Sequence, residues 1–229
     1  MAVALAAAGA DVVVAGRAAV ELDETAHQAV RHDVRALPLV TDVTAYAQVE
    51  RLMAQAVETL GRLDVVVNNA GIAKVAPLAD ASLDDWRAIL DVNLSGVFYG
   101  CRAAAPYLVR QRSGKIINVA SVLAAVALPG YTMYSATKGG VIALTRTLAA
   151  EWARHNIQVN AIAPGWFVTD MNEAAFADPR IHDRLTRDVP ARRTGRVEEI
   201  GPLAVYLASA GSDFMTGQAV FLDGGQTVV

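Results

Sequence analysis

The sequence has little cysteine, little net charge and no long apolar run. Its single cysteine, Cys101, excludes an internal disulfide framework and is typical of a chain in a reducing compartment. Because Cys101 lies in a helical apolar stretch, we expect a small core residue there. The formal net charge of −3 gives no reason to expect nucleic acid or an anionic membrane as a partner. No apolar run approaches the roughly 18 residues of a membrane-spanning helix.

The chain opens on an apolar segment, MAVALAAAGA, that could pass for the core of a signal peptide. No basic residue precedes the apolar run, and a predicted strand follows it at once. We therefore interpret the segment as a helix of the domain, and we expect a cytoplasmic protein.

The 229 residues alternate short β-branched runs with longer helical patterns, and 54% of them are hydrophobic, enough for a sizeable core. Six nearly continuous apolar runs predict parallel strands covered on both faces: 11–16, 36–40, 63–69, 115–121, 157–163 and 219–223. Helical patterns separate them, at roughly 19–33, 45–60, 83–111, 133–154 and 197–209. Ser82 is the predicted N-cap of the third helix. This order predicts a doubly wound parallel sheet in a single α/β domain over residues 1–229.

Residues 170–193 depart from this alternation. The segment is long, polar and charged, and it lies between the last two predicted strands. Connections of that length inside a compact domain are usually functional lids. We expect a substrate lid, with a solvated surface excursion as the alternative.

Two residues in NVASVLAAVALPGYTMYSATKGG carry candidate chemistry. Tyr134 and Lys138 stand four positions apart at the start of a predicted helix, so their side chains share one face. An ammonium about 4 Å from a phenol, at an effective dielectric constant of about 20, favours the phenolate by about 4 kcal/mol. That energy lowers a pKa by about three pH units. The pair is therefore suited to proton transfer near neutral pH, although the spacing also occurs by chance on surface helices.

Three other features of the sequence accompany this pair. Ser121 ends a predicted strand at the carboxyl edge where open α/β sheets bind ligands, NNAG (68–71) ends the preceding strand, and Asn93 lies within a predicted helix. With Tyr134 and Lys138, these motifs make the chain resemble the short-chain dehydrogenase/reductase family along its whole length, to LDGG near the end. The resemblance implies a Rossmann-like fold and an NAD(P)-dependent oxidoreductase that interconverts a secondary alcohol and a ketone by hydride transfer.

The resemblance also implies a role for each catalytic residue. Tyr134 would be the general acid/base, and Lys138 would lower its pKa and hold the nicotinamide ribose. Ser121 would hydrogen-bond the substrate oxygen, and Asn93 would order a water that relays protons to Lys138. Tyr131 competes for the first role, but a serine instead of a lysine stands four positions beyond it.

Cofactor contacts follow from the same resemblance. It implies adenine contacts after the second strand, backbone contacts along NNAG, and a segment over the nicotinamide whose threonine hydroxyl meets the carboxamide. The residues concerned are Asp42, Val43, Asn69, Ala70, Gly71, Tyr134, Lys138, Pro164, Gly165, Phe167 and Thr169.

The end of the first strand decides the choice between NAD and NADP. NAD-preferring members usually carry an acidic residue there, whereas this sequence has Gly16 and Arg17. An arginine can pair with a 2′-phosphate. We therefore expect Arg17 to bind NADP, with NAD possible and a solvated arginine as the alternative interpretation.

The family's first strand and its Thr-Gly-x-x-x-Gly-x-Gly loop are absent from the sequence. We expect that roughly 20 residues are missing, and with them the amides that hold a pyrophosphate. In the family's strand order 3-2-1-4-5-6-7, the lost strand lies between strands 2 and 4, so two strands should have unpaired edges. We interpret Met1 as an internal methionine of a longer chain. The alternatives are a truncated fold with weak cofactor binding and a non-catalytic binding protein.

The substrate is less constrained. The four histidines (His27, His32, His155 and His182) show no metal-ligand spacing, so we expect no catalytic metal. The C-terminal third resembles members that act on sugar acids, of the gluconate 5-dehydrogenase and 2-deoxygluconate 3-dehydrogenase types. Similar tails occur in 3-oxoacyl-carrier-protein reductases, which are the alternative. The family also commonly forms tetramers, and we expect a homotetramer that acts on a small molecule.

Overall fold

The computed structural model describes residues 1–169, 172 and 176–229. Each predicted strand is present with its ends within a few residues of the prediction: β1 (Val12–Gly16), β2 (Ala36–Val40), β3 (Val65–Asn68), β4 (Gly114–Val119), β5 (Ile157–Pro164) and β6 (Ala219–Leu222). The helices are α1 (Ala2–Ala7), α2 (Ala19–Val30), α3 (Tyr46–Leu60), α4 (Leu83–Leu90), α5 (Gly96–Gln111), α6 (Thr132–Trp152), α8 (Pro179–Thr186) and α9 (Ile200–Ala208). The alternation of strand and helix confirms the α/β class. None of the described helices has both the length and the apolar character of a membrane span.

All strand pairs are parallel, and they form two sheets instead of one. One sheet has the order β1–β2 and the other has the order β3–β4–β5–β6. In the described part of the chain no ladder joins β1 to β3. This break lies where the missing strand was expected, so the prediction of two unpaired edges is confirmed. The fold is Rossmann-like with an interrupted sheet.

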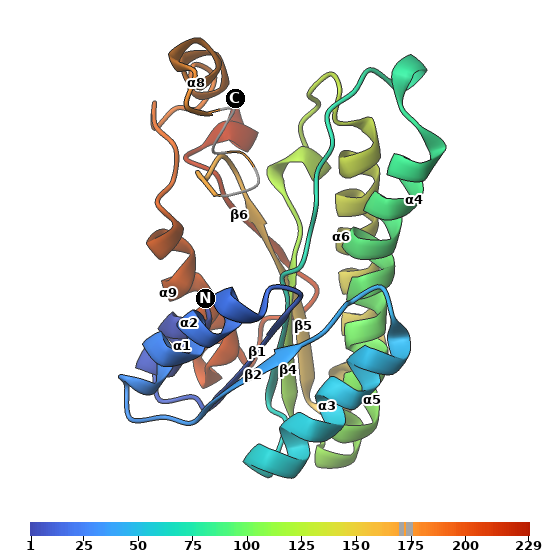
Figure 1. Ribbon diagram of the computed structural model, residues 1–229, viewed down its shortest axis with the longest axis vertical. Helices are drawn as coiled ribbons and strands as arrows, with labels where there is room; N and C mark the ends of the chain where they lie inside the picture. The colour runs from blue at the N-terminus through green and yellow to red at the C-terminus, as the bar shows by residue number, and fades with distance from the viewer. Residues whose placement is uncertain (170–171, 173–175) are drawn as a thin grey trace.

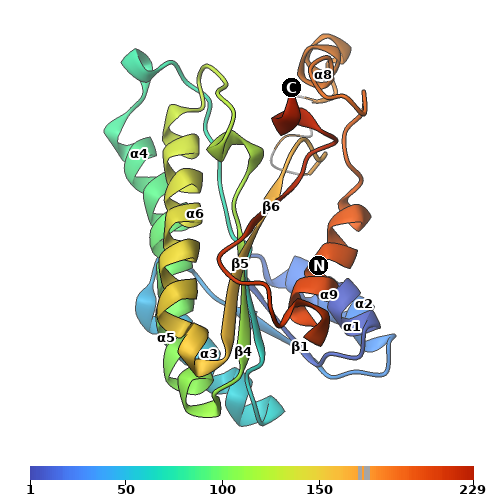
Figure 2. The ribbon, with the colours of Figure 1, turned by 180° about the vertical axis from the view of Figure 1, so that it is seen from behind.

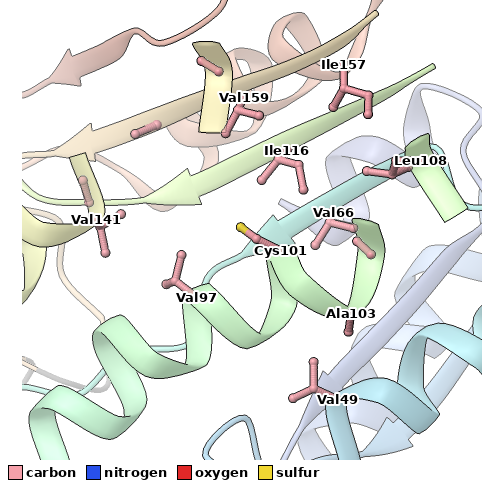
Figure 3. Close-up of a cluster of buried hydrophobic side chains, with 14 of the residues drawn as sticks. Val49, Val66, Val97, Cys101, Ala103, Leu108, Ile116, Val141, Ile157 and Val159 are labelled. Carbon is pink, nitrogen blue, oxygen red and sulfur yellow. The ribbon is translucent and has the colours of Figure 1, made fainter. Parts of the chain in front are cut away.

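Helices cover both faces of the strands. In Figures 1 and 2, α3, α5 and α6 lie on one face, while α1, α2 and α9 lie on the other. Because side chains alternate along a strand, neighbouring residues of β4 supply different cores. Ile116 packs with Cys101 and Val97 of α5 (Figure 3), whereas Ile117 packs with Leu207 of α9. Cys101 is 2% exposed, which confirms the prediction of a core residue, and this burial raises the pKa of its thiol to about 12.

The predicted helix over 83–111 is interrupted in the structure. Ser82 caps α4, because its hydroxyl accepts a hydrogen bond from the amide of Asp85 at 3.0 Å. A π-helical turn, Asp91–Ser95, then separates α4 from α5. Such turns cost regular hydrogen bonds and are frequent at functional sites. This one places the fully buried Asn93 toward the segment after β3.

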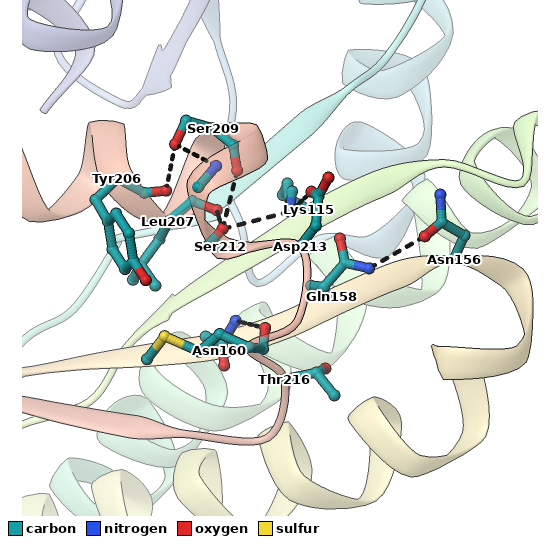
Figure 4. A network of polar contacts seen from close by, with 12 residues as sticks. Lys115, Asn156, Gln158, Asn160, Tyr206, Leu207, Ser209, Ser212, Asp213 and Thr216 are labelled. Carbon is teal, nitrogen blue, oxygen red and sulfur yellow. Dashed lines mark hydrogen bonds and ion pairs between the residues drawn. The ribbon is translucent and has the colours of Figure 1, made fainter.

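A polar cluster closes the edge of the sheet where β4 and β5 begin; we call it the amino-edge cluster (Lys115, Asn160, Ser212, Asp213 and Thr216). The ammonium of Lys115 lies 2.6 Å from the carboxylate of Asp213 and donates to the Ser212 hydroxyl at 3.3 Å. The side-chain amide of Asn160 donates to the Met215 carbonyl at 2.7 Å. Figure 4 shows how these contacts anchor the segment before β6 to β4 and β5. Each polar group there has a partner, as buried groups require.

Candidate active site

Ser121 lies just beyond the carboxyl end of β4. It is 7% exposed and caps a short 3-10 turn, where its hydroxyl oxygen accepts a hydrogen bond from the amide of Leu123 at 3.2 Å. The cap fixes the side chain at the edge of the sheet where ligands bind in open α/β folds. Ser121 is therefore placed where the sequence predicts it.

Tyr134 and Lys138 occupy the first two turns of α6 and face β4. The Lys138 ammonium lies 5.6 Å from the centre of the Tyr134 ring and donates to the carbonyl of Val119 at 2.6 Å. Ser121 acts on the Tyr134 phenol in the direction that lowers its pKa. A hydroxyl, a phenol and an ammonium thus converge at the end of one strand, and such a set can deliver a proton to a substrate oxygen and stabilise the resulting anion.

Burial dominates the electrostatics of Tyr134 and Lys138. Burial raises the pKa of Tyr134, and the Ser121 side chain offsets part of that increase. Burial also lowers the pKa of Lys138 to about 8. Desolvation of the phenolate is the largest influence on Tyr134, and the lowering of its pKa by Lys138 stays a prediction. Tyr134 is therefore a protonated phenol at neutral pH.

Asn93 connects the site to the segment after β3. Its side-chain oxygen accepts from the amide of Ile72 at 2.8 Å, and its side-chain nitrogen donates to the Ile72 carbonyl at 2.9 Å. A Cβ added to Gly71 would lie 3.5 Å from Asn93 Oδ1 and 3.6 Å from Lys138 Nζ. A side chain at Gly71 would therefore occupy the space beside the ammonium.

The predicted adenine-side residues lie at the ends of β1 and β2. Asp42 accepts hydrogen bonds from the amide and hydroxyl of Thr44, which hold its pKa below the ordinary value, and the positive charge of Arg17 adds to the effect. Arg17 is exposed beside this carboxylate. Val43 packs against Gly96 at the start of α5, where an added Cβ would lie 3.0 Å from it. Asn69 and Ala70 are exposed just after β3.

The segment after β5 contains the residues predicted over the nicotinamide. Gly165, which follows Pro164, donates its amide to the Leu222 carbonyl at 2.9 Å, and an added Cβ would lie only 2.7 Å from the Cα of Asp223. Phe167 is 7% exposed and packs against Gly195, so its ring is directed into the protein. Thr169 is exposed, and its amide donates to Asn172 Oδ1 at 2.8 Å. Close packing between chain segments, as well as any ligand, therefore constrains Gly165 and Phe167.

The sequence interpretation missed a buried amide that supports the site. Asn118 of β4 is fully buried; it accepts from the Asn68 side chain at 2.8 Å and donates to the Thr145 hydroxyl at 2.9 Å. These bonds join β3, β4 and α6 just below Val119, which holds Lys138. A polar residue inside the apolar run KIINVAS was the available signal, because a buried amide needs partners.

The sequence interpretation also missed a row of four aromatic side chains beside the site, which we call the aromatic wall. It consists of Tyr131, Trp166, Phe176 and His182, whose rings meet edge to face with successive centres 6.4, 6.0 and 5.9 Å apart. Tyr131 also lies edge-on to Tyr134, at 6.3 Å. The wall therefore runs from the candidate catalytic phenol to α8. Part of the predicted lid, residues 170–171 and 173–175, lies outside the described residues.

Comparison with known proteins identifies the family. Residues 1–227 match the family model described as enoyl-(acyl carrier protein) reductase. The chain is 40% identical over 224 residues to gluconate 5-dehydrogenase of Gluconobacter oxydans, covering 98% of this chain and 88% of that protein. It is 42% identical over 191 residues to the 3-oxoacyl-[acyl-carrier-protein] reductase FabG of Thermotoga maritima, covering 83% of this chain and 77% of that protein.

A solved structure agrees with these matches. The crystal structure of a gluconate 5-dehydrogenase from Burkholderia cenocepacia in complex with NADP and tartrate is 41% identical, with a TM-score of 0.95 over 100% of this chain and 89% of that one. The chain belongs to the short-chain dehydrogenase/reductase family, as its motifs predict. It is an NAD(P)-dependent oxidoreductase that acts on CH–OH groups.

Proposed function

We propose that the protein interconverts the alcohol and ketone forms of a sugar acid, with NADP as its cofactor. The convergence of Ser121, Tyr134 and Lys138 at the end of β4 carries the proposed chemistry. Similarity to two gluconate 5-dehydrogenases supports the substrate class.

The catalytic roles follow from the protonation states of the site. A bound nicotinamide supplies or accepts the hydride. Tyr134, which burial keeps protonated at neutral pH, donates its proton to the substrate oxygen during ketone reduction. Ser121 orients that oxygen through its hydroxyl. Below pH 8 Lys138 is an ammonium that stabilises the phenolate left on Tyr134.

The residues present fit a dinucleotide at two places. Gly71 leaves space beside Lys138, which suits a ribose that hydrogen-bonds the ammonium, and Asn93 holds this segment through Ile72. Arg17 presents an exposed guanidinium beyond β1, which suits a 2′-phosphate. The glycine-rich loop that would hold the pyrophosphate does not occur in these 229 residues. The first experiment is therefore a fluorescence titration that measures whether this chain binds NADPH.

Arg17 gives a sharp test of cofactor choice. We expect Arg17→Ala to weaken NADPH binding about 10-fold, because a charge-assisted bond to phosphate is lost, and to change NADH binding less than about twofold. Arg31→Ala, an exposed arginine at the end of α2, is the matched control. Equal weakening of both cofactors by Arg17→Ala would contradict the assignment of Arg17 to the 2′-phosphate.

The substrate is tested by NADPH consumption with three ketones: 5-keto-D-gluconate, the neutral ketose D-fructose and acetoacetyl thioester. We expect turnover of the keto acid. A second candidate function, reduction of 3-oxoacyl thioesters, is favoured by the identity with the Thermotoga maritima reductase, and turnover of the thioester alone would establish it instead. NADPH binding without turnover of any ketone favours a non-catalytic binding protein.

The segment 170–193 is proposed as a lid over the substrate. Phe176 and His182 of this segment extend the aromatic wall that begins at Tyr131. Limited proteolysis with and without NADPH and 5-keto-D-gluconate tests this role. We expect the ligands to slow cleavage within 170–193, whereas an unchanged rate contradicts a closing lid.

We also propose that the protein is a cytoplasmic homotetramer that associates through α5, α6 and β6. Phe98 of α5 is 49% exposed, and the outer face of α6 has a hollow lined by Gly139, Ala143 and Phe221. Exposed apolar surface of this kind is typical of subunit contacts. Light scattering after size separation measures the assembly, and a monomer at all concentrations contradicts the proposal. The lone buried thiol is consistent with a reducing compartment.

A further inference from the structure

Two side-chain atoms stand out because they are buried without a hydrogen-bond partner. Among the described residues these are Nε1 of Trp166, a donor, and Oε1 of Gln226, an acceptor. A buried polar group without a partner destabilises a protein by about 1–3 kcal/mol, and native structures contain few of them. A single ligand group that both accepts and donates a hydrogen bond could satisfy the unpaired donor and the unpaired acceptor together.

The two atoms belong to segments that contact each other beyond β5 and β6. Gly165, next to Trp166, donates its amide to the Leu222 carbonyl at 2.9 Å, and its Cα packs against the backbone of Asp223. Gln226 in turn donates its amide to the carbonyl of Asp223 at 3.3 Å. Both segments therefore lie at the carboxyl end of the sheet, on the same side as α8 and the C-terminus in Figure 1.

The aromatic wall connects Trp166 to the reaction site. The Trp166 ring centre lies 6.4 Å from that of Tyr131, which lies 6.3 Å from that of Tyr134. One aromatic ring thus separates the unpartnered indole from the proton donor. A substrate whose ketone meets Tyr134 and Ser121 would extend along this wall toward Trp166.

We propose that Trp166 and Gln226 together bind one hydroxyl group of the substrate, at a carbon remote from the reacting one. The indole N–H donates to the hydroxyl oxygen, and the Gln226 carboxamide oxygen accepts the hydroxyl hydrogen. A hydroxyl is the small neutral group that satisfies a donor and an acceptor at once. This inference rests on the proposed function and narrows it to polyhydroxylated substrates, because an acyl chain leaves both atoms unsatisfied.

Two conservative variants test the pair. Trp166→Phe retains the ring and removes the N–H, while Gln226→Met retains the length and removes the acceptor. For 5-keto-D-gluconate we expect each variant to raise KM about 3- to 10-fold, the range of a single neutral hydrogen bond, with kcat within about twofold. Deoxy analogues, each lacking one hydroxyl, should include one whose KM neither variant changes. Trp152→Phe is the control. Trp152 is the last residue of α6, at the end of the helix far from Tyr134, and its substitution should leave KM unchanged.

A double-mutant cycle excludes a bond between the two side chains themselves. If Trp166 and Gln226 bond each other after a small rotation, the double variant shows coupling in the unfolding stability of the ligand-free protein while KM stays unchanged. That result overturns the inference. Coupling in KM, with additive effects on ligand-free stability, supports a shared hydroxyl.

The outcomes separate this inference from the proposed function. Turnover of 5-keto-D-gluconate with unchanged KM in both variants overturns the hydroxyl site alone. Turnover of acetoacetyl thioester alone overturns the sugar-acid function and the hydroxyl site together. If nothing is turned over, D-gluconate is titrated against tryptophan fluorescence. Quenching that disappears in Trp166→Phe supports the site, and no quenching in the wild-type protein overturns it.

Discussion

Two buried lysines stand at opposite ends of β4 and have opposite environments. Lys115, in the amino-edge cluster, is paired with the carboxylate of Asp213 at 2.6 Å and also bonds the Ser212 hydroxyl. Lys138, at the carboxyl end, bonds the Val119 carbonyl, and no carboxylate lies within ion-pair distance of it in the part of the chain that the structure describes. Burial lowers the pKa of Lys138 to about 8. The buried ammonium of Lys115 therefore has a counter-charge, whereas that of Lys138 is held by a backbone carbonyl alone.

The comparison extends to the neighbouring polar groups. At the amino edge, Asn160 and Thr216 have hydrogen-bond partners within the protein. At the carboxyl edge, Trp166 and Gln226 each leave an atom unsatisfied. Incomplete satisfaction is expected where a ligand supplies the missing partners, because a fully satisfied site has nothing left to bind with.

The largest expected effect separates activity from stability at the carboxyl end. Tyr134→Phe removes the proton donor and keeps the ring, so we expect kcat to fall about 1,000-fold, within the range of general acid catalysis. NADPH affinity and unfolding stability should change little. Tyr206→Phe, at an exposed position of α9, is the control, and its kcat should stay within about threefold of the wild type. A similar kcat for Tyr134→Phe and the wild type would show that the proton comes from elsewhere.

Lys138→Met should raise the unfolding stability of the protein and abolish its activity. The pKa of Lys138 falls from its ordinary 10.5 to about 8 in the folded protein, and each pH unit corresponds to about 1.4 kcal/mol. After allowance for the lost bond to Val119, we expect the variant to be about 2 kcal/mol more stable than the wild type at pH 7, and inactive.

The pH dependence gives the sign of this effect. Between pH 8 and 10.5 the unfolded chain binds more protons at Lys138 than the folded protein does, so this residue makes the wild type more stable as pH rises. The advantage of Lys138→Met should therefore shrink across that window, as measured by denaturant unfolding at several pH values. A constant difference between the two proteins across this window would show that folding does not lower the pKa of Lys138.

A smaller effect is expected at the amino edge. Asp213→Asn leaves the Lys115 ammonium without its counter-charge, and we expect a loss of about 1–2 kcal/mol of unfolding stability. Because the Asp213 side chain is 63% exposed, water compensates part of the lost pairing. KM and kcat should not change. Asp84→Asn, at an exposed aspartate of α4, serves as the control. An altered KM in Asp213→Asn would show that the amino edge of the sheet affects activity as well as stability.

Much of the fold could be predicted from the sequence, and for physical reasons. The parallel strands are apolar on both faces, so runs such as 157–163 are evident without a structure. The interrupted sheet was also predictable, because the absent strand is central in the family's order. The π turn at Asp91–Ser95 could not be predicted, since hydrophobic periodicity does not distinguish it from a regular helix.

Some features of the candidate site could likewise be predicted from the sequence, and others could not. Spacing and family motifs predicted Asn93, Ser121, Tyr134 and Lys138 as candidate catalytic residues, because their order along the chain is local information. The direction of the Tyr134 pKa came from tertiary structure, since burial depends on segments distant in sequence. The interior position of Phe167 was decided by its contact with Gly195.

The sequence by itself determined the order of strands and helices, the candidate catalytic residues and the break in the sheet, because these depend on composition, period and spacing along the chain. Only the tertiary structure decided which buried polar groups find partners. It paired Lys115 and left Trp166 and Gln226 unsatisfied. Hydrogen bonds and desolvation depend on distances between residues far apart in the chain.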